Sequence, residues 1–412
     1  MHKDSLLHVD LAAIGRNARS LVAMVGPRAT CCGIVKADAY GIGARRVAET
    51  LLEAGMTRLA VFRVDEAIDL LGAGPPVPIV LLAPIRSLSP VHPLAPAVQR
   101  GDVELVLHDD RQMDDLLALA RLGSTRVSVH VEIDTGMCRG GMKPEAARPL
   151  ISRILRSPLL RLRGVMTHFS EAGRDAAATR KQHGLFRSVV ESLGPLPASC
   201  QVHAAATAAA VRDPAYHWDC VRIGLGWCGC VPGDEALANR LERPLTPALA
   251  WRSSICHAHE VPAGTSVGYG GVWTAPQDTV IGIVPVGYAD GIPPAAGATD
   301  QRCGASIRVH PPQSVASGEG RGAAAAIVGA VSMDQIAVDL GALRGRADSF
   351  VGRGVEIIET AHNGPHSLRG FAQACGLTPH QLLVGIGPRV PRVSVSRPLV
   401  EQPSEAWQAA AV

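Results

Sequence analysis

Lys36 is the residue whose type and position most clearly permit covalent chemistry. It directly follows the apolar run Cys31–Val35, and only four lysines occur in the whole chain. A lysine at the end of a buried strand loses hydration, which disfavours its charged form and leaves an amine that can form a Schiff base. The plainer interpretation is a lysine that only extends its charge from a strand end into water.

Three other polar residues follow or end apolar runs in the same manner. His168 follows one run, Thr207 lies in the Ala-rich turn after another, and Arg222 lies just before Gly224. The Thr207 hydroxyl and the amides of the Gly-rich turn are donors suited to a phosphate. Taken one at a time, these side chains also fit structural roles. Their chemistry therefore depends on whether the fold brings them together.

The elements that must position them alternate regularly in the first half of the chain. The apolar runs are Cys31–Val35, Leu59–Phe62, Ile79–Leu82, Val103–Leu107, Val127–Ile133, Leu162–Thr167, Cys200–His203 and Cys220–Ile223. Helical patterns lie between them at Ala44–Ala54, Glu66–Leu71, Arg111–Leu122, Pro144–Arg156 and Ala176–Leu193. Such runs are typical of parallel strands buried on both faces. The alternation predicts an α/β fold with a (β/α)8 TIM barrel, whose catalytic groups gather at the C-terminal mouth. A doubly wound open sheet is the alternative.

The pattern changes after about Pro244. Alternating runs separated by Gly, Pro and Asp turns predict a C-terminal, mainly antiparallel β domain. These runs are Thr279–Val284, Ser306–His310, Ala326–Val331, Gln335–Val338 and Val355–Ile358. We therefore predict a barrel domain over residues 1–243, a β domain over 244–402 and a disordered tail over 403–412.

The composition excludes several classes of protein. The 412 residues carry 40 basic and 37 acidic side chains and few aromatic rings, which argues against a nucleic-acid binder. Cys228 and Cys230 lack a partner pair at metal-ligand spacing, so we expect no metal site and read the ten cysteines as reduced thiols. The sequence has neither a signal-peptide pattern nor an apolar run of membrane-spanning length. A cytoplasmic location is the expectation.

A series of motifs occurs in a fixed order along nearly the whole chain. They are Val35-Lys36-Ala37-Asp38-Ala39-Tyr40-Gly41, Asp134-Thr135-Gly136-Met137-Cys138-Arg139-Gly140-Gly141, Thr167-His168-Phe169, Val221-Arg222-Ile223-Gly224, Gly268-Tyr269-Gly270, Gly287-Tyr288-Ala289-Asp290-Gly291, Ser332-Met333-Asp334-Gln335 and Pro388-Arg389-Val390-Pro391-Arg392-Val393. In this order they resemble the alanine racemase family of fold-type III, pyridoxal-phosphate-dependent amino-acid racemases. The family fold, a barrel followed by a β domain, agrees with the strand pattern.

The resemblance implies pyridoxal 5'-phosphate as cofactor and a two-base proton transfer. Lys36 would hold the cofactor and act as one base, and Tyr269 would be the other. Racemisation removes the α-proton from one face of the carbon and returns it to the other, so two groups on opposite faces suffice. Tyr40, Thr207 and Gly224 would bind the phosphate.

The resemblance also assigns His168 and Arg222. Arg222 would face the ring nitrogen of the cofactor, where a permanent cation disfavours protonation of that nitrogen. The carbanion then stays short-lived, which favours racemisation over transamination. His168 and Arg222 would supply hydrogen bonding and positive charge near the tyrosine base.

Substrate binding and the entrance are implied in the same way. Arg139 and the backbone of Met333 would orient the substrate carboxylate, and Tyr288 and Asp334 would guard the entrance. Tyr269, Met333 and Asp334 would come from the neighbouring chain. The resemblance therefore implies a head-to-tail homodimer with shared active sites and no membrane or nucleic-acid partner.

Three positions depart from the family pattern. Glu132 stands where many relatives carry a lysine that becomes carboxylated, and its own carboxylate is expected to hold Arg139 directly. Ala206 replaces the usual asparagine before the phosphate-binding hydroxyl. His380 stands where a phosphate-binding tyrosine is expected, and a missing ring beside the substrate would admit a larger side chain.

Interconversion of L- and D-alanine is the function that the resemblance implies. A racemase of broader specificity, for serine or basic amino acids, is one alternative. A fold-related lyase such as a D-threonine aldolase and an inactive cofactor-binding relative are two others. The motif order argues against the lyase, and the presence of both Lys36 and Tyr269 argues against the inactive relative.

Overall fold

The computed structural model describes residues 5–86, 88–89, 91–123, 126–233, 235–311 and 322–395. They form two compact units. One spans Ile14–Leu245, and the other combines the residues up to Ala13 with those from Thr246 onward. The tail predicted over 403–412 lies outside the described residues.

The first unit contains eight parallel strands in the order β8-β7-β6-β5-β4-β3-β2-β9. Their bounds are β2 (Thr30–Ile34), β3 (Arg58–Val61), β4 (Ile79–Leu81), β5 (Val103–Leu107), β6 (Val127–Glu132), β7 (Leu160–Met166), β8 (Gln201–His203) and β9 (Cys220–Ile223). The two ends of this order meet, because the Asp219 amide donates to the Val202 carbonyl at 2.9 Å and the Arg222 amide to the Ala205 carbonyl at 2.9 Å. The sheet is thus closed as a (β/α)8 barrel, as predicted.

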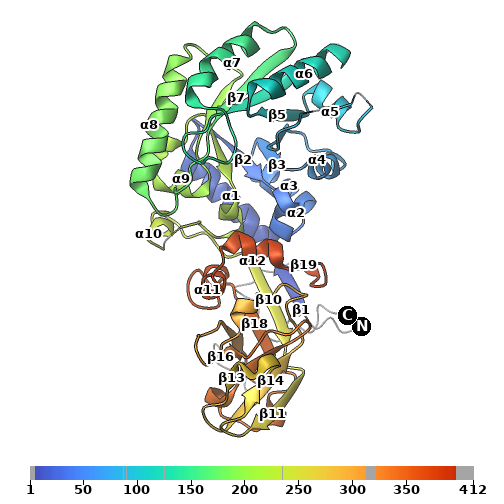
Figure 1. Cartoon of the computed structure of the whole chain (residues 1–412), viewed down its shortest axis with the longest axis vertical. Helices are drawn as coiled ribbons and strands as arrows, with labels where there is room; N and C mark the ends of the chain where they lie inside the picture. Colours follow the sequence, from blue (N-terminus) through green and yellow to red (C-terminus); the bar gives the residue numbers. More distant parts are fainter. Residues whose placement is uncertain are drawn as a thin grey trace. The chain divides into compact units, whose positions relative to one another are not determined.

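Helices surround these strands, and α6, α7 and α8 lie outside the sheet in Figure 1. The helices are α1 (Leu11–Val25), α2 (Lys36–Gly41), α3 (Ala44–Glu53), α4 (Val64–Leu71), α5 (Ala95–Arg100), α6 (Asp110–Gly123), α7 (Pro144–Arg156), α8 (Ala176–Ser192), α9 (Thr207–Arg212) and α10 (Glu235–Ala238). Every residue of β5 and β6 is buried. These strands are apolar runs in the sequence because both of their faces are buried.

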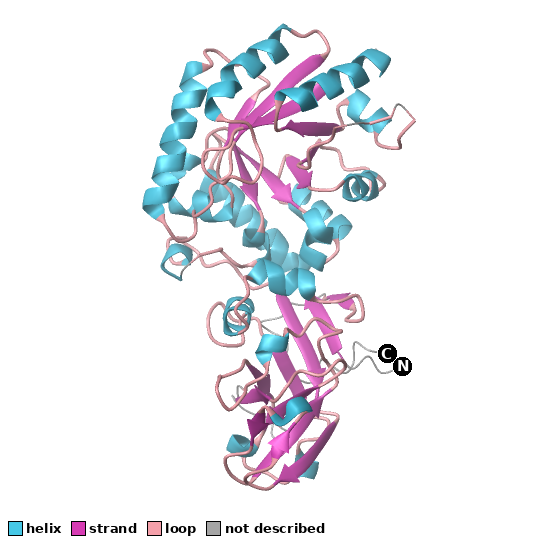
Figure 2. Cartoon of the chain, in the orientation of Figure 1, coloured by secondary structure: helices cyan, strands magenta, loops and turns pink. Residues whose placement is uncertain are grey.

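The second unit is built on a nine-stranded sheet in the order β11-β14-β17-β16-β15-β18-β10-β1-β19. Its strands are β1 (Ser5–Val9), β10 (Leu249–Ser254), β11 (His257–Val261), β14 (Thr279–Val284), β15 (Ser306–Val309), β16 (Ala323–Val328), β17 (Ile336–Asp339), β18 (Gly354–Ile358) and β19 (Arg392–Ser394). The hairpin β12 (Ser266–Val267) and β13 (Trp273–Thr274) and the helices α11 (Leu368–Ala374) and α12 (Pro379–Gly385) complete it. All pairs in the large sheet are antiparallel except β1–β19, so the predicted antiparallel character is confirmed. Strands dominate this unit in Figure 2.

The strand β1 corrects the predicted domain boundary. Ser5 opposes Ser253 and Val9 opposes Leu249 in an antiparallel pair with β10, and the other edge of β1 pairs with β19. The prediction that the barrel domain begins at residue 1 is wrong for this strand. A five-residue apolar strand fits either sheet, and its partners lie more than 200 residues away in the chain.

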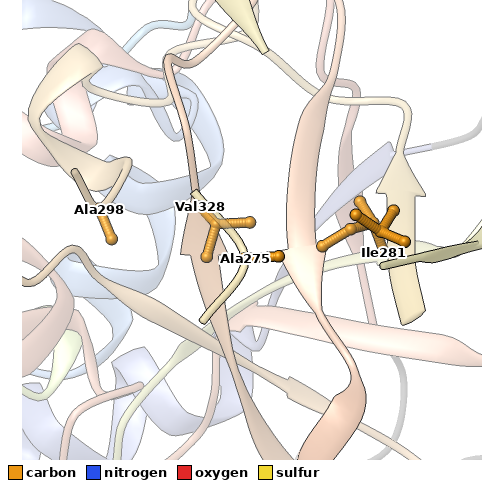
Figure 3. Close-up of a cluster of buried hydrophobic side chains, with 5 residues drawn as sticks. Ala275, Ile281, Ala298 and Val328 are labelled. Atoms are coloured by element: carbon orange, nitrogen blue, oxygen red, sulfur yellow. The ribbon is translucent and has the colours of Figure 1, made fainter. Parts of the chain in front are cut away.

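Small aliphatic side chains fill one core of the second unit. Val261, Ala275, Ile281, Ala298 and Val328 are buried together in this cluster, and four of them are labelled in Figure 3. Interdigitated aliphatic side chains reach close packing without rings. The five buried members are all aliphatic, and the partly buried Trp273 packs against them.

Candidate active site

Lys36 begins a short segment of unusual backbone directly after β2. Ala37, Asp38, Ala39 and Tyr40 all have positive φ, between 51° and 61°. Left-handed conformation costs a non-glycine residue roughly 1–2 kcal/mol. Such a run persists only where surrounding contacts enforce it, and it is frequent at functional sites.

Two carboxylates hold this left-handed turn. The Ala37 amide donates to Glu66 Oε1 at 2.7 Å, and the Ala44 amide donates to Asp38 Oδ1 at 2.7 Å. Glu66 Oε2 also accepts from the Phe62 amide at 2.9 Å, so one side chain ties the turn to the start of α4. These contacts fix Lys36 at one end of the turn and Tyr40 at the other.

The environment of Lys36 lowers the pKa of its side-chain amine. Burial lowers the pKa of its ammonium group, and the nearby charge of Arg139 lowers it further, while Glu66 opposes the shift. A lysine whose pKa is lowered by desolvation is the form that attacks a carbonyl. The structure thus gives Lys36 the property that its position in the sequence suggests.

Tyr40, Thr207 and Gly224 come together at a cradle beside this turn. The Gly224 amide donates to Thr207 Oγ1 at 3.0 Å. A Cβ added at Gly224 would lie 2.6 Å from the Tyr40 hydroxyl, so only glycine fits at this position. The Tyr40 ring stacks on Trp227 with centroids 5.4 Å apart and an 8° interplanar angle. Two hydroxyls and a glycine turn gathered beside a reactive lysine fit a phosphate-bearing aldehyde cofactor.

Arg222 is held rigidly in the barrel interior. It is 4% exposed, and its Nη2 donates to the Thr167 carbonyl at 2.7 Å and to the Ala204 carbonyl at 2.9 Å. Its Nε–H makes no hydrogen bond with any described residue. A fixed guanidinium with one remaining donor can serve a ring nitrogen that accepts.

His168 is kept neutral beside this arginine. Burial and the adjacent Arg222 guanidinium lower the pKa of His168 to about 3. Arg222 Nη2 lies 3.3 Å from His168 Nδ1. Because a guanidinium only donates, Nδ1 must accept, and the ring proton of His168 is on Nε2.

Glu132 and Arg139 do not form the predicted pair. Glu132 Oε2 instead lies 3.4 Å from His108 Nδ1, which accepts from the Gly141 amide at 2.9 Å. Arg139 is exposed and makes no hydrogen bond or ion pair with the residues that the structure describes. Glu132 ends the buried strand β6, whereas Arg139 belongs to the following loop. The Arg139 guanidinium is therefore accessible from solvent.

The remaining predicted residues belong to the second unit and form an exposed group. Tyr269 is 75% exposed, Met333 52% and Tyr288 46%. The Tyr288 amide donates to the Ser332 carbonyl at 3.0 Å and the Ala289 amide to the Met333 carbonyl at 3.0 Å, so the two loops are joined. Exposed large side chains on joined loops, such as Tyr288 and Met333, are typical of a contact or ligand surface.

Asp334 and His380 occupy structured positions in the same unit. Asp334 forms an ion pair with Arg389 at 2.8 Å, and Arg389 also lies 3.4 Å from Asp290. The arginine thus links the Met333 loop to the Tyr288 loop. His380 is in the first turn of α12, whose N-cap Thr378 exchanges hydrogen bonds with Gln381.

Several residues of the barrel site were not predicted from the sequence. Glu66 holds the turn after Lys36, and Glu104 and His130 belong to a buried chain that runs through His203, the last residue of the predicted run Cys200–His203, to Arg222. Glu104 and His130 stand inside apolar strands, where a polar side chain requires a partner. The need of these two residues for partners could therefore have been recognised from the sequence. The partners themselves come from different strands.

The described residues contain neither a metal-binding cluster nor a membrane-spanning helix. Among the described residues, no group of three or more His, Cys, Asp or Glu side chains is arranged to hold a metal ion. Cys228 donates its thiol hydrogen to the Leu225 carbonyl at 3.2 Å. None of the described helices has the length and apolar character needed to span a membrane.

The fold and site define a class: a TIM-barrel protein with a desolvated lysine, a phosphate cradle at the barrel mouth and a C-terminal β domain. Family models for the N-terminal and C-terminal domains of alanine racemase match residues 9–232 and 248–394. The chain belongs to the alanine racemase family.

Individual relatives agree over the full length. The chain is 32% identical to an alanine racemase from Synechocystis over 396 residues, which cover 94% of this chain and 98% of the relative. The crystal structure of alanine racemase from Streptomyces lavendulae matches with a TM-score of 0.82 at 28% identity, covering 96% of this chain and 98% of that one. The alanine racemase from Bartonella henselae, solved with covalently bound pyridoxal phosphate, matches with a TM-score of 0.79 at 25% identity, covering 95% and 99%.

Proposed function

We propose that this chain interconverts L- and D-alanine with pyridoxal phosphate bound at the barrel mouth. The observation that carries the proposal is the cradle of Tyr40, Thr207 and Gly224 beside the desolvated Lys36. The named activity of relatives that match over the whole length supports the same reaction.

The residues that hold the cofactor follow from the cradle. Tyr40, Thr207 and Gly224 would hold its phosphate, and Arg222 would serve its ring nitrogen through the Nε–H that has no partner among the described residues. When bound, the cofactor stabilises negative charge on the α-carbon of the substrate. Lys36 supplies the attaching amine.

Proton transfer is assigned to Lys36 and Tyr269. One base takes the α-proton from one face, and the conjugate acid of the other returns a proton to the opposite face, so no net proton is consumed. Tyrosine has an ordinary pKa of about 10, and a neutral donor such as His168 Nε2–H would stabilise its phenolate. Arg139, free of partners within the described residues, takes the substrate carboxylate together with the Met333 amide.

We propose that Tyr269 acts in the site of a second copy of the chain, within a head-to-tail homodimer. Its 75% exposure supports this assignment, because an exposed phenol gains its environment on association. We also propose a cytoplasmic location, which the ten free thiols support because that compartment keeps thiols reduced.

The dimer proposal is tested by mixing two inactive variants. Lys36→Ala and Tyr269→Phe chains, unfolded and refolded together, form mixed dimers with one fully native site each if Tyr269 acts across the interface. Mixing should then restore roughly a quarter of the native activity. No recovery in mixtures that are dimeric by sedimentation would place Tyr269 in its own chain's site.

The reaction is tested by exchange of the α-proton in deuterated water. The holoenzyme is incubated with L- and D-forms of alanine, serine, lysine and threonine, with proton NMR for exchange and chiral chromatography for product. Exchange and inversion of alanine in both directions support the proposal. Preference for serine or lysine would indicate a broader racemase, for which the His380 substitution gives a reason. Glycine released from threonine would indicate a lyase, and a bound cofactor without exchange would indicate an inactive relative.

A further inference from the structure

A chain of buried side chains crosses the barrel interior and ends at Arg222. His130 Nε2 lies 2.8 Å from Glu104 Oε2, and His130 Nδ1 lies 3.1 Å from His203 Nε2. His203 Nδ1 lies 2.9 Å from Arg222 Nη1. Glu104 and His130 are each 1% exposed, and His203 is 4% exposed. The chain is therefore sealed from water along its length.

The two ends of this hydrogen-bonded series, Glu104 and Arg222, determine the position of every proton within it. A guanidinium can only donate, so His203 Nδ1 must accept and the His203 proton must be on Nε2. That proton is donated to His130 Nδ1, which leaves the His130 proton on Nε2. The carboxylate of Glu104 can only accept it. Protonating either ring would place two N–H groups against each other, so both imidazoles are neutral.

The surrounding residues keep this arrangement in place. A Cβ at Gly164 would lie 2.0 Å from His130 Nδ1, so the glycine of β7 makes room for the ring. Glu104 also accepts from Arg58 Nε at 3.0 Å and from Arg163 Nε at 2.9 Å. Burial alone would raise the pKa of Glu104, but the bonds from His130 and Arg58 lower it, and the carboxyl stays ionised. Burial lowers the pKa of both histidines.

We propose that Glu104 and His130 are positioning residues for Arg222: acting through His203, they fix one direction of hydrogen bonding and so hold the guanidinium in a single orientation. This inference rests on the proposed role of Arg222 at the cofactor ring nitrogen. Neither residue contacts the reacting atoms. Their role is to make the His203 ring an acceptor toward Arg222 at every pH at which the enzyme is folded.

The test is nitrogen NMR of the histidine rings in the full-length holoenzyme. Signals are assigned by their loss in His130→Gln and His203→Gln variants. Both rings should carry the proton on Nε2 and stay neutral from about pH 6 to about pH 8, the range in which a free histidine titrates. A proton on Nδ1 of either ring, or titration in this range, would overturn the proposal.

The same measurement on His130 variants tests the link to Arg222. His130→Leu removes the acceptor for His203, whose ring should then lose its single tautomer, and kcat should fall by roughly tenfold, as for other outer hydrogen-bond partners. His130→Gln keeps an amide oxygen toward His203 and an amide N–H toward Glu104, and should restore most of the loss.

His217→Leu is the matched control, since this buried histidine of the same unit bonds only to the Ala210 carbonyl, at 2.9 Å. It should leave the His203 signal and kcat unchanged. An unchanged His203 tautomer in folded His130→Leu would contradict the proposal. If His130→Leu does not fold, the tautomers measured in the native protein still test the proposal. Correct tautomers in a protein that fails to racemise alanine would count against the proposed function alone.

Discussion

The two units present their site residues in opposite ways. In the barrel, Tyr40 and Arg222 are each 4% exposed and Thr207 is 2% exposed; Arg222 and Thr207 are hydrogen-bonded, and the Tyr40 ring stacks on Trp227. In the β unit, Tyr269 and Met333 are 75% and 52% exposed. The site residues of the barrel are buried and held in place by the fold, whereas those of the β unit are exposed on its surface.

Because of this difference, the two sets of residues should contribute differently to catalysis and to folding stability. A buried, hydrogen-bonded group positions a cofactor without further ordering, which is the main requirement for electrostatic catalysis. An exposed phenol contributes little to folding, so its substitution changes activity without changing stability. Variants in the two units should therefore separate effects on activity from effects on stability. Four variants are expected to show this, with effects of decreasing size.

The largest effect is expected for Lys36→Ala. It removes both the attaching amine and one base, so activity should fall by at least ~10³-fold and the visible absorbance of the bound cofactor should disappear. Absorption spectra and the racemisation assay measure both. Lys181→Ala, on the exposed face of α8, is the control and should change neither. A native cofactor spectrum in Lys36→Ala would rule out the lysine assignment.

Tyr269→Phe should have the next largest effect. Loss of the phenol should slow removal of the α-proton from one enantiomer by roughly 10²–10³-fold, with cofactor binding and melting temperature unchanged. Primary deuterium isotope effects, measured for the L-to-D and the D-to-L conversion, report the removal of the α-proton. Tyr216→Phe, a buried tyrosine that packs against Phe169 in the barrel unit, serves as control. Equal slowing of both enantiomers would count against two separate bases.

Gly224→Ala tests the preorganised cradle. The added methyl would meet the Tyr40 hydroxyl at 2.6 Å, so the affinity for pyridoxal phosphate should fall by roughly tenfold or more. Titration of the apoenzyme measures the dissociation constant. Gly184→Ala, in α8 with open space around its Cβ, should leave affinity unchanged and stabilise the helix by up to about 1 kcal/mol. Similar affinities for the two variants would remove Gly224 from the phosphate site.

The smallest effect concerns the pH dependence of folding in the β unit. His8 is 2% exposed, and burial together with Arg252 lowers its pKa to about 4 from 6.5. Between these values the unfolded chain binds the proton more readily, so the free energy of unfolding should fall as the pH falls, by about 1 kcal/mol per pH unit at most.

Denaturant unfolding at a series of pH values measures this slope. His8→Leu should flatten it between pH 6.5 and about 4. His257→Leu, at an exposed position on β11, should leave the slope as in the native protein. A slope unaffected by His8→Leu would assign the acid sensitivity to other groups.

The barrel strands were predictable because parallel strands buried on both faces must be apolar runs. The predicted run Val103–Leu107 coincides with β5, and Lys36 follows β2 as expected. The expected strand Ala326–Val331 instead runs over Ala323–Val328 as β16. Gly329, at φ 70°, ends it, and the alanines before it give no apolar contrast.

The pairing of charges was not predictable in the same way. Glu132 has the charge to hold Arg139, but its position on a buried strand brings it to His108 instead. Charge identifies which groups need partners, while the partner depends on which side chains the fold brings within hydrogen-bond distance. The same limit applies to β1, whose sequence fits a strand of either sheet.

The sequence by itself determined the α/β class, the order of the motifs, the position of Lys36 at a strand end and the family, because these depend on residue type and local spacing. Tertiary structure alone decided the left-handed turn that Glu66 holds, the cradle around Gly224 and the protons of His130 and His203. Each of these is a relation between groups that belong to different elements of the fold. Hydrogen-bond direction is fixed only when donor and acceptor are placed together in space.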